Sequence, residues 1–359
     1  MSFLSINWKD GAITEKNPIG LNGVDFLEYA GPDAAVLEKL FTQMGFIELA
    51  KVANKNIKLF RQGDINFILN CEPNTFAMKF ANDHGPCVSS TGFRVGNAAA
   101  SFEAAIARGA KVYDGNEASR GASPFFAIYG IGDSLIYFID EKNHKEMYER
   151  IFALKDNSVR PMGLGFQTVD HFTNNVPKGD MSKWFKFYEG VFNFHEIKYF
   201  DIKGKSTGLL SQALGSPCGK FAIPINEPTD SKSQIQEYLD EYKGSGIQHI
   251  AMTTENIIPT IDQLKSNDVQ FLSAPPETYY SMLKDRLPLV SEDVSRLQKN
   301  AILVDGDHEG YLLQIFTKNV IGPVFFEAIQ RKGHDGFGNG NFQALFDAIE
   351  ADQRARGYL

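Results

Sequence analysis

The chain alternates between short runs with apolar residues at every second position and longer segments with apolar residues three or four positions apart. The first pattern is typical of half-buried strands and the second of amphipathic helices. Residues 34–44 show the helical pattern. Residues 57–61 and 65–69 are β-like and flank a Gln-Gly-Asp turn, which predicts a hairpin. From about residue 23 onward, strands therefore mix with crossing helices.

The same order of elements recurs along the chain. In the first half, a strand at 92–95 precedes a helix at 98–108 and a hairpin of 125–129 with 134–139. The second half predicts strands at 165–171, 209–214, 220–224, 246–252, 301–304 and 311–317, and helices at 181–192, 233–242 and 257–265. The helix at 233–242 has no obvious counterpart in the first half. One strand, one helix and two or three strands, repeated four times, predict curled mixed sheets with helices outside and room for a site inside.

The repeat also aligns two histidines with two phenylalanines. Val-Asp-Phe, ending at Phe26, corresponds to Val-Asp-His, ending at His171. The run at 92–95 corresponds to 248–251, so that Phe93 aligns with His249. We therefore expect one half to be kept for structure, without a metal and with both phenylalanines buried, and the other half for chemistry. The five remaining histidines lie in loop-like or charged surroundings and are predicted to be surface residues: His84, His144, His195, His308 and His334.

A third ligand is expected from a late strand. Glu327 lies between Phe326 and Ala328, and a carboxylate buried among apolar side chains is costly unless a cation pairs with it. That cation is either a metal or Arg331, in which case Glu327 would be a surface residue of an amphipathic helix. Two imidazoles and one carboxylate on separate strands form a facial set of ligands, which indicates non-heme Fe(II). Zinc more often takes a tetrahedral site.

Composition narrows the class of protein. The chain has 359 residues, a net charge of −8 and 43% hydrophobic residues, as expected of a globular protein with about two domains. The acidic balance argues against a nucleic-acid partner. The three cysteines follow no CxxC spacing, and neither a basic leader nor an 18-residue apolar run is present. We therefore expect a cytoplasmic protein without a disulfide framework or a membrane span.

Several long motifs resemble the 4-hydroxyphenylpyruvate dioxygenase family. They are GIQHIAM at 246–252, PINEP at 224–228, KSQIQEYL at 232–239, LLQIFTKNVIGPVFFEAIQRKG at 312–333 and GFGNGNFQALFDAIE at 336–350. The resemblance implies an α+β vicinal-oxygen-chelate fold, with four βαβββ modules in two barrel-like domains. The first domain (1–155) would be structural or serve oligomerisation. The second (156–359) would hold one Fe(II) per subunit on His171, His249 and Glu327.

The resemblance also implies the substrate and the residues around it. 4-Hydroxyphenylpyruvate and O2 would be converted to homogentisate and CO2 in tyrosine catabolism, in a homodimer or homotetramer. The polar residues carried over are Ser211, Asn226, Gln234, Gln248 and Gln314, and the aromatic ones are Phe316, Phe325, Phe337 and Phe342. The alternatives are a hydroxymandelate synthase, which uses the same substrate, and a non-catalytic binding protein on the same scaffold.

The C-terminal tail admits two interpretations. Residues 333–340 are rich in glycine, and 341–356 carry an apolar helical stripe. The tail is either a docked helix with a structural role or a lid whose aromatic residues close a pocket, with the glycines as a hinge. The glycine spacing does not match a nucleotide-binding fingerprint, because no strand of a βαβ unit precedes it.

Overall fold

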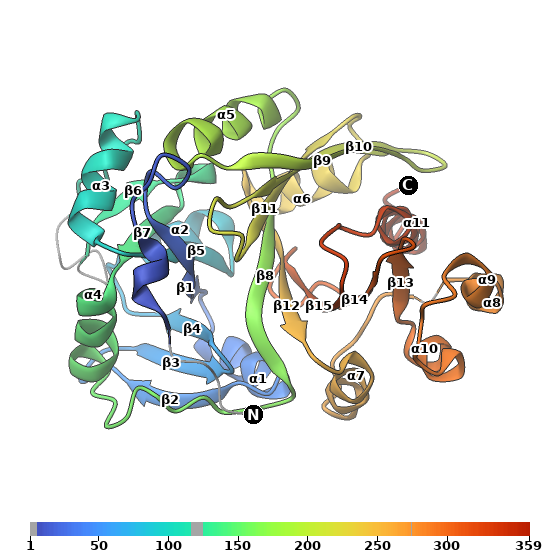
Figure 1. Ribbon diagram of the computed structural model, residues 1–359, viewed down its shortest axis with the longest axis horizontal. Coiled ribbons are helices and arrows are strands. Elements are labelled where there is room, and N and C mark those ends of the chain that lie inside the picture. Colours follow the sequence, from blue (N-terminus) through green and yellow to red (C-terminus); the bar gives the residue numbers. More distant parts are fainter. Residues whose placement is uncertain (1–5, 116–124, 274) are drawn as a thin grey trace.

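The computed structural model describes residues 6–115, 125–273 and 275–359. It contains two curled sheets that lie side by side, with the helices on the outside (Figure 1). The first sheet has the strand order β2-β3-β4-β1-β5-β7-β6, and the second has the order β13-β14-β15-β12-β8-β11-β10-β9. Each sheet mixes parallel and antiparallel pairs, as the expected vicinal-oxygen-chelate fold requires.

The first sheet comes from the first 140 or so residues of the chain. Its strands are β1 (Leu21–Ala30), β2 (Ile47–Lys51), β3 (Ile57–Gln62), β4 (Ile65–Asn70), β5 (Cys87–Val95), β6 (Ala127–Tyr129) and β7 (Leu135–Ile139). Its helices are η1 (Trp8–Gly11), α1 (Ala34–Gln43), α2 (Phe76–His84), α3 (Ala98–Ala107), η3 (Ile131–Asp133), α4 (Glu141–Lys145) and the π-helical turn η4 (Glu146–Ile151).

The second sheet repeats this plan with longer strands. Its strands are β8 (Phe166–Asn175), β9 (His195–Lys203), β10 (Gly208–Gly215), β11 (Ala222–Pro228), β12 (Gly246–Thr254), β13 (Leu303–Gly306), β14 (Tyr311–Phe316) and β15 (Phe325–Lys332). Its helices are α5 (Met181–Phe192), α6 (Gln234–Tyr242), α7 (Ile257–Ser266), α8 (Glu277–Ser281), α9 (Leu283–Arg286), α10 (Val294–Asn300) and α11 (Asn339–Ala355).

The fourfold repeat predicted from the sequence is confirmed. β1-α1-β2-β3-β4 matches β8-α5-β9-β10-β11, and β12-α7-β13-β14-β15 is the fourth module. The second module is reduced, because an isolated bridge between Val112 and Ile128 stands where β13 pairs with β14 in the fourth. The fold class therefore agrees with the expectation in every module.

The pattern missed some elements and misjudged one. α6 does have a counterpart, because α2 also links two modules of its sheet. The two linker helices even touch: His84 lies 2.8 Å from the carbonyl oxygen of Tyr242 and stacks on its ring. The edge strand β9 was missed because most of its side chains are exposed, so that it shows little alternation. The short helices α8 to α10 were missed as well.

Aromatic side chains join the two halves. Phe67 stacks on Phe326, and Phe93 packs against Phe172 and Phe221. All of these rings are buried, and burying a large side chain contributes roughly 1.5–3 kcal/mol. None of the helices among the described residues is both long and apolar enough to span a membrane.

Candidate metal centre

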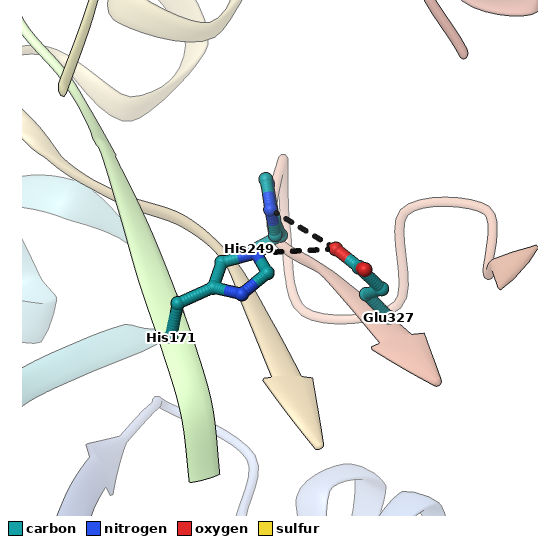
Figure 2. A group of neighbouring side chains, drawn as sticks. All are labelled: His171, His249 and Glu327. Atoms are coloured by element: carbon teal, nitrogen blue, oxygen red, sulfur yellow. Dashed lines mark ion pairs between the residues drawn. The ribbon is translucent and has the colours of Figure 1, made fainter. Parts of the chain in front are cut away.

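Three possible metal ligands converge from three adjacent strands. His171 lies on β8, His249 on β12 and Glu327 on β15, the central strands of the second sheet. Glu327 Oε2 lies 3.3 Å from His171 Nε2 and 3.5 Å from His249 Nε2, and the three side chains point toward one another (Figure 2). The ligand atoms lie within 4.8 Å of each other. Strand pairing explains the convergence, since His171 and Glu327 both pair with Ala251 of β12.

The two imidazoles differ in their affinity for a proton. Burial lowers the pKa of His171, but the carboxylates of Glu327 and Asp170 outweigh burial and raise it to about 9. Burial and the neighbouring His171 hold the pKa of His249 well below its usual value. A cation can therefore bind in place of one proton, next to a second imidazole that is already neutral.

A second layer of side chains holds the ligands in place. Asp170 lies 2.8 Å from His171 Nδ1, and Gln314 donates a 2.8 Å hydrogen bond to Glu327. Arg331 does not pair with Glu327, as the alternative interpretation required, but with Asp170. Among the described residues, the ion-pair partners of Glu327 are the two histidines. Glu327 is thus a buried carboxyl group beside imidazoles, on a strand rather than on the surface of a helix.

A cavity opens beside the three ligands, which form part of its lining. Six of the nine expected pocket residues line it together with the ligands: Ser211, Asn226, Gln314, Phe316, Phe337 and Phe342. Ser211 and Asn226 lie opposite each other on β10 and β11. The aromatic rings come from β14 and from the tail. The cavity is therefore mainly apolar, with a few polar groups near the ligands.

The other three expected residues line a neighbouring cavity. Gln234, Gln248 and Phe325 face that space, under α6 and α11. Gln248 contacts a residue of the first cavity, because its Oε1 accepts a 3.4 Å hydrogen bond from Asn226. Phe325 stacks on the ring of His249 at 4.8 Å. Gln248 and Phe325 of the second cavity therefore contact residues that line the first.

Two buried amide oxygens, one beside each cavity, have no partner among the described residues. They are Asn226 Oδ1 and Gln234 Oε1, and both side chains are more than nine-tenths buried. A buried polar atom without a hydrogen bond is costly, so such atoms usually meet water or a ligand. Asn226 therefore offers an acceptor to a polar group that enters the cavity beside the ligands, and Gln234 offers one on the side of the neighbouring cavity.

The C-terminal tail covers the cavity. Phe337 meets the ring of His171 edge-on at 5.2 Å, and Phe342 packs edge-on against Phe200. Gly338 adopts a positive φ of 67°, and a Cβ there would lie 2.6 Å from Gln314 Oε1. Glycine is therefore needed where the chain turns to bring both aromatic rings toward the ligands. α11 then packs on the second domain through buried Leu345 and Phe346.

The first sheet shows what stands at the equivalent positions. Phe26 pairs with Gly92 as His171 pairs with Ala251, which supports the first alignment. The second alignment is wrong: Glu28 pairs with Ser90 as Thr173 pairs with His249, so that Ser90 and not Phe93 matches His249. Tyr137 pairs with Gly92 as Glu327 pairs with Ala251. Phe93 is buried as expected, but it faces the second domain.

One histidine prediction was also wrong. His144 is buried, with Nδ1 2.8 Å from Asp25, whereas His195 and His308 are exposed as expected. Sequence reasoning also missed several residues around the ligands. The signal for Thr173 was available, because strand alternation places it on the same face as His171, and its hydroxyl lies 3.0 Å from His249 Nε2. Phe200 lies on the missed strand β9 and gave no signal.

The donor set fits a divalent transition metal. Two imidazole nitrogens and one carboxylate oxygen, all buried at one end of a cavity, leave coordination positions that face the open space. A structural zinc site would need a fourth protein ligand. The His171–His249–Glu327 group is therefore a candidate metal site with room for further ligands.

Comparisons with known proteins agree with this arrangement. The model of the N-terminal domain of hydroxyphenylpyruvate dioxygenase matches residues 15–153, and that of the glyoxalase, bleomycin resistance protein and dioxygenase superfamily matches 168–315. Protein MelA of Shewanella colwelliana is 49% identical over 96% of this chain and 99% of its own. The 4-hydroxyphenylpyruvate dioxygenase of Legionella pneumophila strain Corby is 49% identical over 96% and 98%.

Solved structures agree on the fold. A mutant of 4-hydroxymandelate synthase from Streptomyces coelicolor superposes with a TM-score of 0.80, covering 93% of this chain and 99% of its own. At 24% identity this likeness concerns the fold alone. The much higher identity to the dioxygenases, over nearly the whole length of both chains, shows that the chain belongs to the 4-hydroxyphenylpyruvate dioxygenase family.

Proposed function

We propose that the protein converts 4-hydroxyphenylpyruvate and O2 to homogentisate and CO2 with one Fe(II) per subunit. The observation that carries the proposal is the buried group of His171, His249 and Glu327 at the end of an aromatic cavity, in a chain of this family. Supporting it, three protein ligands leave room on the metal for both a 2-oxo acid and O2. Both oxygen atoms of O2 would end in homogentisate, one in its carboxylate and one in the new ring hydroxyl, while CO2 would carry the carboxylate oxygens of the substrate.

His171 and His249 would hold the iron through Nε2, and Glu327 through Oε2, because these atoms face one another. The bound iron would supply the activation of O2 and the decarboxylation of the 2-oxo acid. Gln314 would keep Glu327 oriented through its 2.8 Å hydrogen bond. One dicationic metal and one carboxylate leave a net positive charge, which suits an anionic substrate in a chain with a net charge of −8.

The remaining pocket residues would bind and orient the aromatic part of the substrate. The unpaired amide oxygens of Asn226 and Gln234 can accept a hydrogen bond from a phenolic hydroxyl. Ser211 adds a hydroxyl on the adjacent strand. Phe337 and Phe342 would exclude water from the reacting centre. Catalysis by the protein is thus positioning and exclusion of water rather than acid–base chemistry.

We propose the same division of labour for the two domains. Residues 1–155 would provide structure and a surface for self-association, and 156–359 would carry the reaction. Homo-oligomerisation as a dimer or tetramer and a cytoplasmic location are part of the proposal. Two observations support the division. The three possible metal ligands lie on the second sheet, and an apolar cluster around Phe26 fills the interior of the first sheet.

One experiment tests the activity. The purified protein is loaded with ferrous iron, and O2 uptake, CO2 release and the aromatic product are measured with 4-hydroxyphenylpyruvate. We expect homogentisate in a one-to-one ratio to CO2. Hydroxymandelate as the main product would identify the synthase alternative, and iron binding without O2 uptake would identify a binding protein.

A further inference from the structure

We propose that Arg331 is a positioning residue that ties the metal ligand His171 to the beginning of the C-terminal tail. It would act through Asp170 on one side and through backbone carbonyl groups of the tail on the other. This inference rests on the proposed metal centre. It adds a connection between the ligand and the segment that covers the cavity.

The first arm of the connection reaches the ligand. Arg331 Nε and Nη2 donate to Oδ2 and Oδ1 of Asp170 at 2.7 and 2.8 Å. Asp170 Oδ1 in turn lies 2.8 Å from His171 Nδ1. An ionised carboxylate accepts hydrogen bonds but cannot donate them, so Nδ1 carries the hydrogen. In the neutral ring this leaves the lone pair of Nε2 on the side of Glu327, where a metal needs it.

The second arm reaches the tail. Arg331 Nη1 donates to the carbonyl oxygens of His334 and Gly336 at 3.0 and 2.7 Å. The guanidinium carbon lies 5.8 Å from the centre of the Phe337 ring, which itself meets His171 edge-on. The guanidinium group of Arg331 therefore holds both the Asp170 carboxylate, which contacts His171, and the loop at the beginning of the tail. Lysine cannot reproduce this geometry, because its ammonium lacks the fixed fork of donors.

The first domain shows that the aspartate alone does not imply this role. Asp25 precedes Phe26 as Asp170 precedes His171. There the carboxylate accepts hydrogen bonds from Arg94 Nε and the Tyr148 hydroxyl and faces His144, while the neighbouring ring belongs to the apolar cluster. An aspartate at this place in the module is thus held by an arginine in both halves. In the second half, however, it also contacts a potential metal ligand.

The consequence is a coupling between ligand orientation and closure of the tail. If the carbonyl groups of the tail move away, Arg331 loses two of its four hydrogen bonds and holds Asp170 less firmly. Conversely, a metal at His171 Nε2 fixes the ring, and with it Asp170 and Arg331. We therefore expect metal binding to slow amide hydrogen exchange in residues 333–338.

Three variants separate the two arms. Asp170→Asn keeps the size of the side chain, but its amide group can donate to Nδ1, which favours the tautomer that blocks Nε2. Its dissociation constant for Co²⁺ should rise ~10–100-fold, as is typical when the outer partner of a ligating histidine is lost. Arg331→Lys keeps the charge beside Asp170 and should change Co²⁺ affinity less, while exchange in 333–338 speeds up. Arg331→Met should show both effects.

The measurements are Co²⁺ titration with a competing chelator and hydrogen exchange with and without the metal, on the full chain. Asp25→Asn is the matched control in the first domain: it should lower thermal stability and leave Co²⁺ affinity unchanged. Arg296→Met, at an exposed ion pair with Asp262, controls for loss of charge. A purely structural role would lower the melting temperature in Asp170→Asn and Arg331→Met without changing Co²⁺ affinity.

The possible outcomes are distinct. If the unsubstituted protein binds no Co²⁺, both the proposed centre and this inference are wrong. If it binds Co²⁺ and Asp170→Asn and Arg331→Met bind it equally well, only the inference is wrong. Should either of these two fail to fold, Arg331→Lys decides through tail exchange: an unchanged rate rejects the connection.

Discussion

The two domains carry the same framework around different interiors. In the second, three central strands present His171, His249 and Glu327 to a cavity. At the same places in the first, β1, β5 and β7 present Phe26, Ser90 and Tyr137. The framework therefore tolerates either a packed interior or a set of ligands. What decides between them is the side chains on three strands and the segment that follows the last strand.

That last segment differs as well. After β7, the helical turns α4 and η4 place Met147 and Tyr148 inside the first barrel, where both are fully buried. After β15, the tail places Phe337 and Phe342 around a cavity instead. In both halves the segment that follows the last strand, β7 or β15, covers the interior of the barrel. In the second half this segment leaves a cavity that could hold a ligand.

Phe26 illustrates how the first interior is filled. Its ring lies against Gly92, where a Cβ would come within 2.4 Å of Cε1. The equivalent residue of the second domain is Ala251, which has room for a Cβ because the neighbouring His171 ring points to Glu327. The first domain thus combines a large phenyl ring with a glycine at this strand pair, where the second domain combines an imidazole with an alanine.

The sharpest test of the comparison is His171→Ala. Loss of a ligand should lower metal affinity and homogentisate formation by more than ~100-fold, since even outer partners of ligating histidines contribute about 10–100-fold. The fold should remain, because the side chain contributes little apolar packing. Metal analysis, turnover and circular dichroism check this. Full activity in this variant would refute the difference between the two interiors.

Removal of the tail tests how the second barrel is closed. Truncation after Gly333 should leave a folded protein that binds iron, because the three ligands lie on the strands that remain. Water would then reach the reacting centre, so that CO2 is released with less homogentisate. The measurement is the ratio of the two products. A ratio equal to that of the full chain would show that α11 is only a structural buttress.

Phe26→Ala tests the filled interior. Removing a fully buried ring should destabilise the protein by ~3–5 kcal/mol through lost burial and a residual cavity. Metal affinity should not change, because the ring belongs to the other domain. Denaturant unfolding and Co²⁺ titration check both statements, with Phe26→Leu as the milder control. A large loss of metal affinity would show that the two interiors are not independent.

The pH dependence of metal binding tests the charges in the second interior. In the metal-free protein the net effect of Glu327 and Asp170, against burial, raises the pKa of His171 to about 9, from the ordinary 6.5. Protonated His171 therefore stabilises the metal-free fold fully below pH 6.5, and this contribution is lost as the pH rises through 9.

A metal must displace that proton. Between pH 6.5 and 9, Co²⁺ affinity should thus rise about tenfold per pH unit, with about one proton released. Calorimetry in buffers of different ionisation enthalpy measures the released proton. An affinity that does not depend on pH would contradict this assignment of charge.

The smallest effect is expected from Glu28→Gln in the first interior. Burial raises the pKa of Glu28, although hydrogen bonds from Ser90 and Asn70 oppose the shift. Because the pKa of this acid is raised in the folded state, its ionisation costs stability as the pH rises above its ordinary value of 4.5.

Glutamine keeps the size of the side chain and stays neutral. At neutral pH the variant should be as stable as the parent or melt about 2–4 °C higher for each kcal/mol gained. Thermal unfolding at several pH values checks this, and Asp25→Asn should show the opposite sign. A clear loss of stability in Glu28→Gln would show that the charged carboxylate is needed there.

The sequence by itself determined most of the elements, the fourfold repeat and the residues of the candidate centre. Spacing of apolar residues depends on the local geometry of helices and strands, so α5 and the hairpin of β3 and β4 were predicted nearly to the residue. His171 and His249 were identified because they lie within strand patterns that begin corresponding units of the repeat, although the residue aligned with His249 was wrong. Glu327 was identified because a buried carboxylate needs a cation.

Only the tertiary structure decided the register and the partners. Local similarity aligned Phe93 with His249, whereas strand pairing matches Ser90. The tertiary structure also pairs Arg331 with Asp170, whereas the sequence had suggested Glu327 as its partner. Both depend on contacts between segments far apart in the chain, and a shift of one residue in a strand moves a side chain to the opposite face. The residues next to each position in the sequence do not indicate the register or the partner, because long-range hydrogen bonds and packing determine both.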